Sequence, residues 1–290
     1  MQRRARSSPS LEGAALGASA DPDILGELRA TFRSTSYHPP LLPASAFQLL
    51  ELSRKQETTF RDLLRILQSD PFVAGRVLQI ARSPLYARGE PVRSLEQALT
   101  RLGITTLTQI FLQVIVTTRI FRSPGYAGPM ETLREHSVAA AHAARAICRH
   151  TTPQDEVAFL CGLLHDVGAA MSLIVLGDLP PNKQPFFSEA IEQSINEVRC
   201  EAAMVVCDAW NLPDDLKSVI AHHHEPFVNG VANPLGCVVL LADYLATTAG
   251  FPGLAEAFHC VELAQTSLGI SEAAWRLIAA DFRAFGSTLS

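Results

Sequence analysis

The run from Phe159 to Ala169 constrains the fold more than any other stretch of the sequence. It reads FLCGLLHDVGA, so an apolar helical segment leads into the adjacent pair His165-Asp166 and then meets Gly168. Burying an imidazole and a carboxylate at the end of a core helix costs free energy unless they bind each other, other polar groups or a cation. The fold must therefore supply partners or a metal ion at this pair.

Residues that typically start or end helices recur along the rest of the chain. Ser69-Asp70-Pro71 is a strong helix start, with an N-cap acid followed by proline. Ser94 is placed to cap a helix over 95–102 that Gly103 ends, and a long helix is expected over 105–121. Further helices are expected over 23–32, 45–53, 60–67, 71–83, 130–150, 154–167, 169–176, 188–210, 213–223, 235–248, 253–268 and 271–285. Because we find no alternating strand pattern of convincing length, we predict an all-α fold.

The positions of these helices and of the loops between them also suggest that the chain is divided into subdomains. We expect a two-lobed helical bundle, with an N-terminal helical subdomain at 23–122 and a second helical subdomain at 130–250. Between them, 123–129 holds two prolines and two glycines and is expected to be a loop. The segment 1–22 is a disordered tail by composition. We expect 251–290 to form C-terminal helices that pack on the second subdomain.

Charge and cysteine content limit the partners and the compartment. A net charge of −5 gives no general attraction for nucleic acid or anionic lipid, so neither is an expected partner. The six cysteines contain no CxxC pair, which favours a reducing cytoplasm over a disulfide framework. No apolar run reaches the roughly 18 uncharged residues that a membrane span needs, so we expect none.

Polar residues interrupt apolar helical faces at four places. They are His136, the pair His165-Asp166, the triplet 222–224 (three histidines) and Asp243. In an all-α bundle, single inward-facing polar residues on different helices can converge on one site. Imidazole and carboxylate together suit Zn, Fe, Mn or Ni. An isolated His-Asp pair, by contrast, is often a buried hydrogen-bonded pair, so convergence with the other residues decides between the two.

Several short segments carry a resemblance to a known family, from about Leu41 to Thr248. They are Ser69-Asp70-Pro71, Ser94 to Gly103, Glu135-His136-Ser137, Gly162 to Gly168, Trp210 to Pro213, Ile220 to Pro226 and Ala242-Asp243. Their order and spacing resemble the HD superfamily of metal-dependent phosphohydrolases. More narrowly, the chain resembles the HDOD domain, the HD-related output domain of bacterial signalling. The second helical subdomain is then expected to be HD-like.

The resemblance assigns roles by position. His136, His165, Asp166 and Asp243 match the four ligands of a mononuclear HD site. This match implies one divalent metal ion (Fe, Mn, Zn or Ni). If the protein is an enzyme, Asp166 is the expected catalytic residue.

One position departs from the family pattern. His223 and His224 match the paired histidines that extend the site in binuclear HD phosphodiesterases, but Arg199 stands where many relatives have a further histidine. Arginine is not deprotonated in proteins and so cannot ligate a metal. We therefore expect no second metal ion. Arg199 could instead supply a fixed cation, paired with Asp166 or another carboxylate.

The remaining histidines are expected away from this site. His222 should face solvent, because its two neighbours fill the family positions. His142 and His150 are expected to be surface or helix-cap residues.

The resemblance implies three functions. The first, which we favour, is a regulatory output module in bacterial signal transduction that binds a protein partner in trans, without turnover. The second is a mononuclear metal-dependent phosphohydrolase acting on a nucleotide or phosphoester. The third is a non-catalytic domain that senses a metal or another ligand. The sequence leaves the oligomeric state open.

Overall fold

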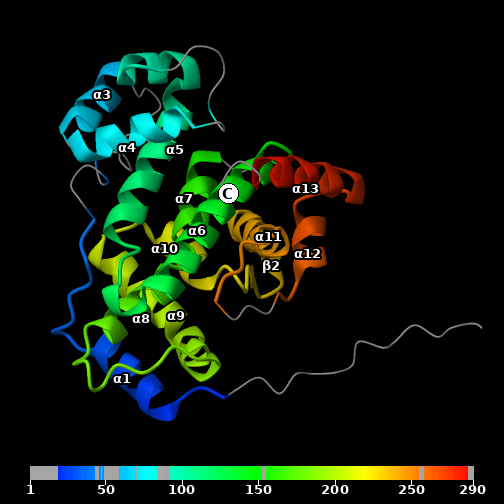
Figure 1. Cartoon of the computed structure of the whole chain (residues 1–290). Coiled ribbons are helices and arrows are strands. Elements are labelled where there is room, and N and C mark those ends of the chain that lie inside the picture. The colour runs from blue at the N-terminus through cyan, green and yellow to red at the C-terminus, as the bar shows by residue number, and fades with distance from the viewer. Residues whose placement is uncertain are drawn as a thin grey trace, which may run out of the picture.

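The structure is a computed structural model that describes residues 19–42, 46, 48, 59–69, 71–83, 86, 92–151, 155–254 and 258–286. It is built from helices (Figure 1). In chain order the elements are α1 (Pro22–Arg33), α3 (Phe60–Ser69), α4 (Pro71–Ala81), α5 (Leu95–Arg119), the short 3₁₀ helix η1 (Pro124–Tyr126), α6 (Ala127–Cys148), α7 (Asp155–Leu164), α8 (Val167–Gly177), α9 (Glu189–Ala209), α10 (Asp214–His222), β1 (Phe227–Val228), β2 (Val231–Ala232), α11 (Pro234–Thr248), α12 (Val261–Ser267) and α13 (Glu272–Gly286). Among the described residues the only strands are β1 and β2, a short antiparallel hairpin. The all-α prediction is confirmed.

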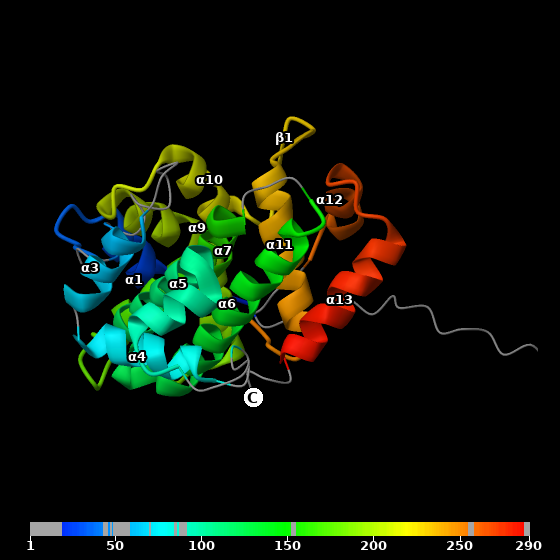
Figure 2. The same ribbon diagram turned by 90° about the horizontal axis from the view of Figure 1, so that it is seen from above.

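The centre of the molecule is formed by α6, α7 and α11, which lie side by side in two views (Figures 1 and 2). Small side chains let α6 and α7 approach closely. A Cβ added to Gly162 of α7 would lie 2.9 Å from the backbone oxygen of Ala140 in α6. Glycine at 162 therefore allows a backbone contact that brings the end of α7 beside α6.

The next layer is formed by α8 and α9, which pack against each other along their length. A Cβ added to Gly168 would lie 2.0 Å from the backbone oxygen of Arg199, a distance that no side chain tolerates. The first turn of α8 and the middle of α9 are thus held in close contact.

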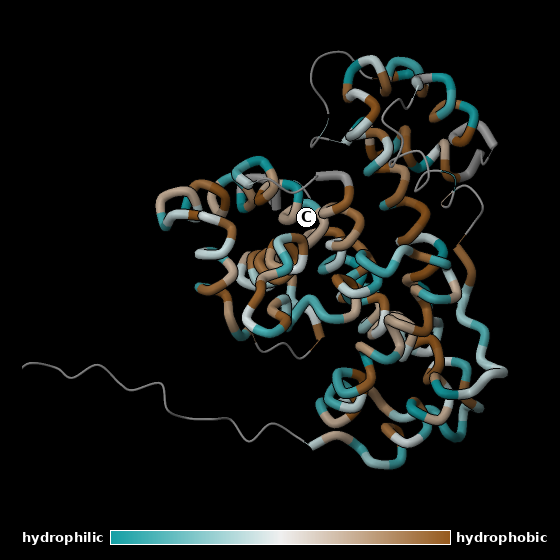
Figure 3. The backbone as a smooth tube through the Cα atoms, turned by 180° about the vertical axis from the view of Figure 1, so that it is seen from behind, coloured by the Kyte–Doolittle hydropathy of each residue, from teal (hydrophilic) through white to brown (hydrophobic). Residues whose placement is uncertain are grey.

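The long helix α5 joins the α3–α4 end of the molecule to its centre. Ser94 caps it by accepting a hydrogen bond from the backbone N–H of Gln97, and Gly103 breaks it with a φ of 80°. Both features were predicted from the sequence. After Gly103, a long hydrophobic stretch of α5 runs into the middle of the molecule (Figure 3).

Two stretches are long and apolar enough to cross a membrane, by length and composition alone. They are Leu95–Arg119, whose most apolar part is 56% buried inside the protein, and Val157–Gly177, whose most apolar part is 94% buried. Core helices pass the same test when they are mostly buried, so this finding is weak support for a span.

The first helix packs away from α3 and α4, at the end of the molecule that holds α8 and α9 (Figure 1). Leu28 and Phe32 of α1 are buried there. Two ion pairs, Arg29–Glu197 and Arg33–Glu201, join it to α9. Exposed ion pairs contribute little to stability, so the apolar contacts anchor this helix. The subdomain boundaries given above stay a prediction.

At the C-terminal end, α12 packs on α11 and α13 packs on α6. The ring of Tyr244 stacks on Trp275 and meets Phe258 edge-on. These helices cover the side of α11 and α6 that faces away from α9 (Figure 2).

Three predicted boundaries were wrong. The loop expected over 123–129 is shorter, because η1 occupies 124–126 and α6 already begins at Ala127. The helix expected to continue through Val167 ends at Leu164, and a turn at His165-Asp166 separates it from α8. The helix expected to begin at Gly253 begins at Val261 in the part of the chain that the structure describes. The helix expected over 45–53 and most of the predicted tail lie outside the described residues.

Candidate metal centre

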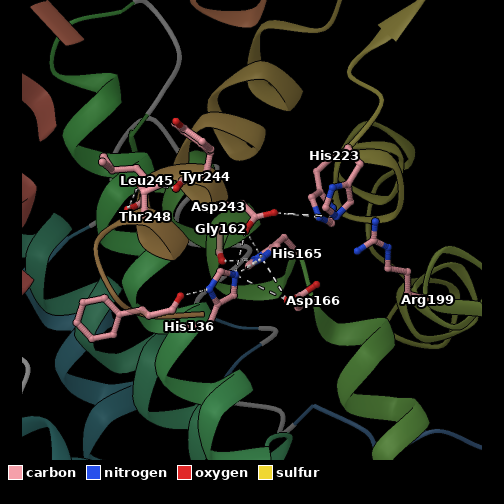
Figure 4. Close-up of polar contacts among 12 residues, drawn as sticks. His136, Gly162, His165, Asp166, Arg199, His223, Asp243, Tyr244, Leu245 and Thr248 are labelled. Carbon is pink, nitrogen blue, oxygen red and sulfur yellow. Dashed lines mark hydrogen bonds and ion pairs between the residues drawn. The ribbon is translucent and has the colours of Figure 1, made fainter. Parts of the chain in front are cut away.

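Four separate parts of the chain bring histidines and aspartates to one buried point (Figure 4). His136 comes from the middle of α6, and His165-Asp166 form the turn between α7 and α8. His223 directly follows α10, and Asp243 lies on α11. These side chains are 0–4% exposed. All four residues predicted as ligands are therefore brought together, and His223 lies with them.

The distances between donor atoms fit a shared ion. The Nε2 atom of His136 lies 3.1 Å from Nε2 of His165 and 3.1 Å from Oδ1 of Asp243. The Oδ2 atom of Asp166 lies 3.4 Å from Nε2 of His165, and Oδ2 of Asp243 lies 3.9 Å from Nε2 of His223. Ligand atoms about 2.1 Å from one metal ion are about 3.0–3.5 Å apart, so the spacings of 3.1 and 3.4 Å need little adjustment. The distances from Nε2 of His136 to Oδ2 of Asp166, 3.8 Å, and from Nε2 of His165 to Oδ1 of Asp243, 4.0 Å, are longer, so these donors must move closer to share one ion.

The tautomers of His136 and His165 also favour a shared metal ion. Nδ1 of His136 lies 2.7 Å from the carbonyl oxygen of Phe251, and Nδ1 of His165 lies 2.8 Å from that of Gly162. In each pair the ring must be the donor, because a carbonyl only accepts. A neutral ring that donates from Nδ1 has its lone pair on Nε2. Both lone pairs then face one another at 3.1 Å, an arrangement that a cation between them would stabilise.

Two of these histidines gain their orientation from helix ends. His165 follows the last residue of α7 and His223 follows the last residue of α10. The ring of His223 lies 3.0 Å from the carbonyl of Ile220, which repeats the spacing of three residues seen between His165 and Gly162. Carbonyls in the last turn of a helix have no partner within the helix and carry partial negative charge. They therefore orient the rings and favour a cation beside them.

The carboxylates supply the test of fit. Three buried carboxylate oxygens accept no hydrogen bond within the described part of the chain. They are Oδ1 and Oδ2 of Asp243 and Oδ2 of Asp166. Burial opposes the ionised form of Asp243, and a neutral His136 ring that donates from Nδ1 has no proton on Nε2 to give to Oδ1 of Asp243, 3.1 Å away. An ionised, buried carboxylate without a hydrogen bond is costly unless a cation binds it. The donor set thus fits one divalent metal.

Two further predicted residues, His224 and Arg199, lie at the edge of this cluster. Nε2 of His224 is 4.0 Å from Oδ2 of Asp243, and its side chain is 13% exposed. Burial, helped by the guanidinium of Arg199, lowers the pKa of His224 to about 3. Arg199 comes from α9 and points toward the histidines (Figure 4). Among the described residues it forms no ion pair with Asp166 or any other carboxylate, so the suggested pairing is not found.

The other histidines divide. His222 and His150 are exposed, as predicted. His142 was expected at the surface or a cap and is instead 3% exposed, with Nε2 3.4 Å from Oε1 of Gln113 and its ring edge-on to Phe159. The prediction was wrong because α5 and α7 cover this face of α6.

Sequence reasoning also missed the carbonyl groups that orient the rings. The spacings from Gly162 to His165 and from Ile220 to His223, each at a predicted helix end, are a local signal that could have found two of them. The carbonyl of Phe251 had no such signal, because it lies 115 residues from His136 along the chain.

The family is decided by a direct comparison of the sequence. The family model of the HDOD domain matches residues 40–226, more than half of the chain. This chain belongs to the HDOD family. Three of the donor residues of this HDOD protein, His136, His165 and Asp166, lie within the matched range, and Asp243 lies beyond it. No curated protein matches the sequence.

Solved structures support the same fold. An HDOD domain protein of unknown function from Geobacter sulfurreducens is 22% identical, with a TM-score of 0.68 over 90% of this chain and 94% of that one. A candidate metal-dependent phosphohydrolase from Shewanella amazonensis SB2B is 17% identical, with a TM-score of 0.67 over 91% and 98%. A candidate signal transduction protein from Marinobacter aquaeolei VT8 is 20% identical, with a TM-score of 0.63 over 91% and 63%. At these identities the likeness concerns the fold alone.

Proposed function

We propose that this HDOD protein is a regulatory protein of a bacterial signalling pathway, which acts by binding a partner protein and holds one divalent metal ion in its core. Membership of the HDOD family supports the regulatory role. The convergence of buried imidazole Nε2 atoms and carboxylates on one point is the observation that carries the metal. The depth of the cluster, 0–4% exposed, favours binding and regulation over turnover of a bulky substrate.

The metal would be held by His136, His165, Asp166 and Asp243, with His223 beside them. Fe, Mn, Zn and Ni all suit this mixture of nitrogen and oxygen donors. Because these ligands come from α6, the α7–α8 turn and α11, a bound ion would tie together elements that are far apart in sequence.

Elemental analysis tests the metal centre. The protein is purified without chelator, beside His165→Ala and a matched control, His222→Ala, which changes an exposed histidine. We expect metal in the wild type and in the control, and a loss of most of it in His165→Ala. Metal-free wild type after loading with each of the four ions, or equal content in all three proteins, would contradict the proposal.

The partner is tested by copurification from the source cells. Proteins that copurify are then produced alone and mixed with the purified chain. A signalling protein that forms a stoichiometric complex by size-exclusion chromatography would support the proposal. If none of them binds the purified chain, the interaction role fails.

One observation favours a second candidate, a mononuclear metal-dependent phosphohydrolase. Oδ2 of Asp166 is buried at the cluster without a hydrogen bond in the described structure, so it could orient a water molecule or accept its proton. A bound metal would polarise a phosphoryl oxygen and lower the pKa of water. Phosphate release from nucleotides or phosphoesters by the metal-loaded protein, lost in Asp166→Asn, would favour this alternative.

A further inference from the structure

The cluster has one side that approaches solvent. Asp243 and His136 are fully buried, whereas the side chain of His224 is 13% exposed and Arg199 is partly exposed. Figure 4 shows Arg199 pointing from α9 toward the histidines on this side. We call Arg199 and His224 the rim of the cluster. A small molecule that reached the cluster from this side would meet the rim first.

The backbone of Arg199 is fixed beside the cluster. Its carbonyl oxygen lies where a Cβ on Gly168 would be 2.0 Å away, so the start of α8 and the middle of α9 are in direct contact. Gly168 is two residues from Asp166. The close approach thus places the backbone of Arg199 beside the start of α8, two residues after Asp166.

The guanidinium of Arg199 carries a charge that the described structure does not balance. Its hydrogen bond from Nη1 to Oδ1 of Asn196 is long at 3.4 Å, and the neighbouring thiol of Cys200 is a second, weakly polar partner. By contrast, Arg29, Arg33 and Arg134 each contact a glutamate. A guanidinium has five N–H donors, so most donors of Arg199 are available for a ligand.

The charge balance predicts the sign of that ligand. One divalent cation would neutralise the carboxylates of Asp166 and Asp243, and the guanidinium of Arg199 would leave one positive charge at the rim. Arginine pairs with the oxygens of carboxylates and phosphates through two parallel N–H groups. A singly or doubly charged oxyanion therefore complements the loaded site.

We propose that the rim formed by Arg199 and His224 binds a small oxyanion, such as a phosphate or carboxylate group, beside the metal ion. This inference rests on the proposed metal centre and adds the chemical class of its ligand. The oxyanion accepts hydrogen bonds from the guanidinium and lies on the solvent side of the metal. In a regulatory protein such a ligand is an input signal.

Binding of anions to the purified, metal-loaded chain tests the rim. Inorganic phosphate, a nucleoside monophosphate and acetate are titrated separately by calorimetry. The proteins are the wild type, Arg199→Met, which removes the charge at similar length, and Arg122→Met, which changes an exposed arginine. Loss of a charged hydrogen-bond partner should weaken binding at least about tenfold in Arg199→Met. Arg122→Met should bind like the wild type.

The outcomes separate this inference from the proposed function. Metal content is measured on the same samples. If metal is present but affinity is the same in Arg199→Met, or none of the three anions binds, the rim is wrong and the metal centre stands. If no metal is found, the metal centre is wrong, and an anion affinity that still depends on Arg199 supports the rim while its absence overturns it. Tighter phosphate than acetate binding assigns a phosphoryl ligand, and the reverse assigns a carboxylate.

A folding defect would not block the test. If Arg199→Met unfolds, Arg199→Lys keeps the charge but loses the paired N–H groups. The lysine variant should bind the three anions more weakly than the wild type does. It should still bind them more tightly than it binds chloride. Equal affinity in Arg199→Lys and the wild type would then count against recognition by the guanidinium.

Discussion

The buried histidines illustrate how a residue's role is set by its second nitrogen. His136 and His165 both donate from Nδ1 to a backbone carbonyl, so in the neutral rings the lone pair is on Nε2, which points into the cluster. His142 lies in the same helix as His136 but meets the amide oxygen of Gln113 and the ring of Phe159 instead. Two histidines six residues apart on α6 thus serve a candidate metal centre and a packed polar contact.

The burial of His142 leads to a prediction about acid stability. Burial, with the nearby Arg145, holds the pKa of His142 well below the ordinary value of 6.5. Below about pH 6.5 the unfolded chain takes up a proton at this residue while the folded protein does not. Stability is therefore present above the unfolded pKa and falls as pH falls, by up to about 1.4 kcal/mol per pH unit.

Urea unfolding between about pH 7.5 and 5.5 measures this effect. His142→Gln should lose less stability over this range than the wild type, whatever its stability at neutral pH. His150→Gln changes an exposed histidine and should follow the wild type. Parallel curves for His142→Gln and the wild type would show that His142 does not contribute. Protons taken up at the metal cluster cancel in this comparison.

At the scale of elements, glycines decide which helices can touch. Gly168 is the contact between α8 and α9, and a side chain there must displace the backbone of Arg199. Gly168→Ala should therefore lower the free energy of unfolding by at least about 2 kcal/mol, since a backbone cannot move aside as a side chain can. Chemical denaturation measures the change.

Gly26 gives the matched control for this substitution. It is exposed in α1, has helical backbone and has no atom within 4 Å of an added Cβ. Gly26→Ala should leave stability unchanged or raise it by about 0.5–1 kcal/mol, because alanine restricts the unfolded chain. A similar loss of stability in both variants would mean that the close α8–α9 contact at Gly168 is not the cause of the loss.

Elements were predictable where the signal is local. The cap at Ser94 and the break at Gly103 depend on residues a few positions away, so the sequence located both. The turn at His165-Asp166 was missed because both residues follow an apolar run that itself favours helix. The burial of His142 was missed because it depends on α5 and α7, which no local pattern places. The donor residues could be named by resemblance, but their orienting carbonyls depend on tertiary contacts such as the one between His136 and Phe251.

At the scale of the whole molecule, the cluster joins segments from His136 to Asp243 in one set of contacts. An ion bound there stabilises only the folded chain, because the unfolded chain does not hold these donors together. Without the ion, the carboxylates of Asp166 and Asp243 stay buried without hydrogen bonds in the described structure. Metal removal should therefore weaken the fold as a whole.

Thermal unfolding with and without chelator measures this coupling. At a metal concentration about a hundredfold above Kd, binding adds about 2.7 kcal/mol, which raises Tm by roughly 5 °C for a chain of this size. His222→Ala should show the same rise as the wild type, because its histidine is exposed, whereas His165→Ala should show little or none. The comparison is made within each protein, between its metal-loaded and chelated forms, so a lower starting Tm in His165→Ala does not affect it. If metal raises Tm equally in all three proteins, the ion binds elsewhere, and if it raises Tm in none of them, the cluster is held together by its own contacts.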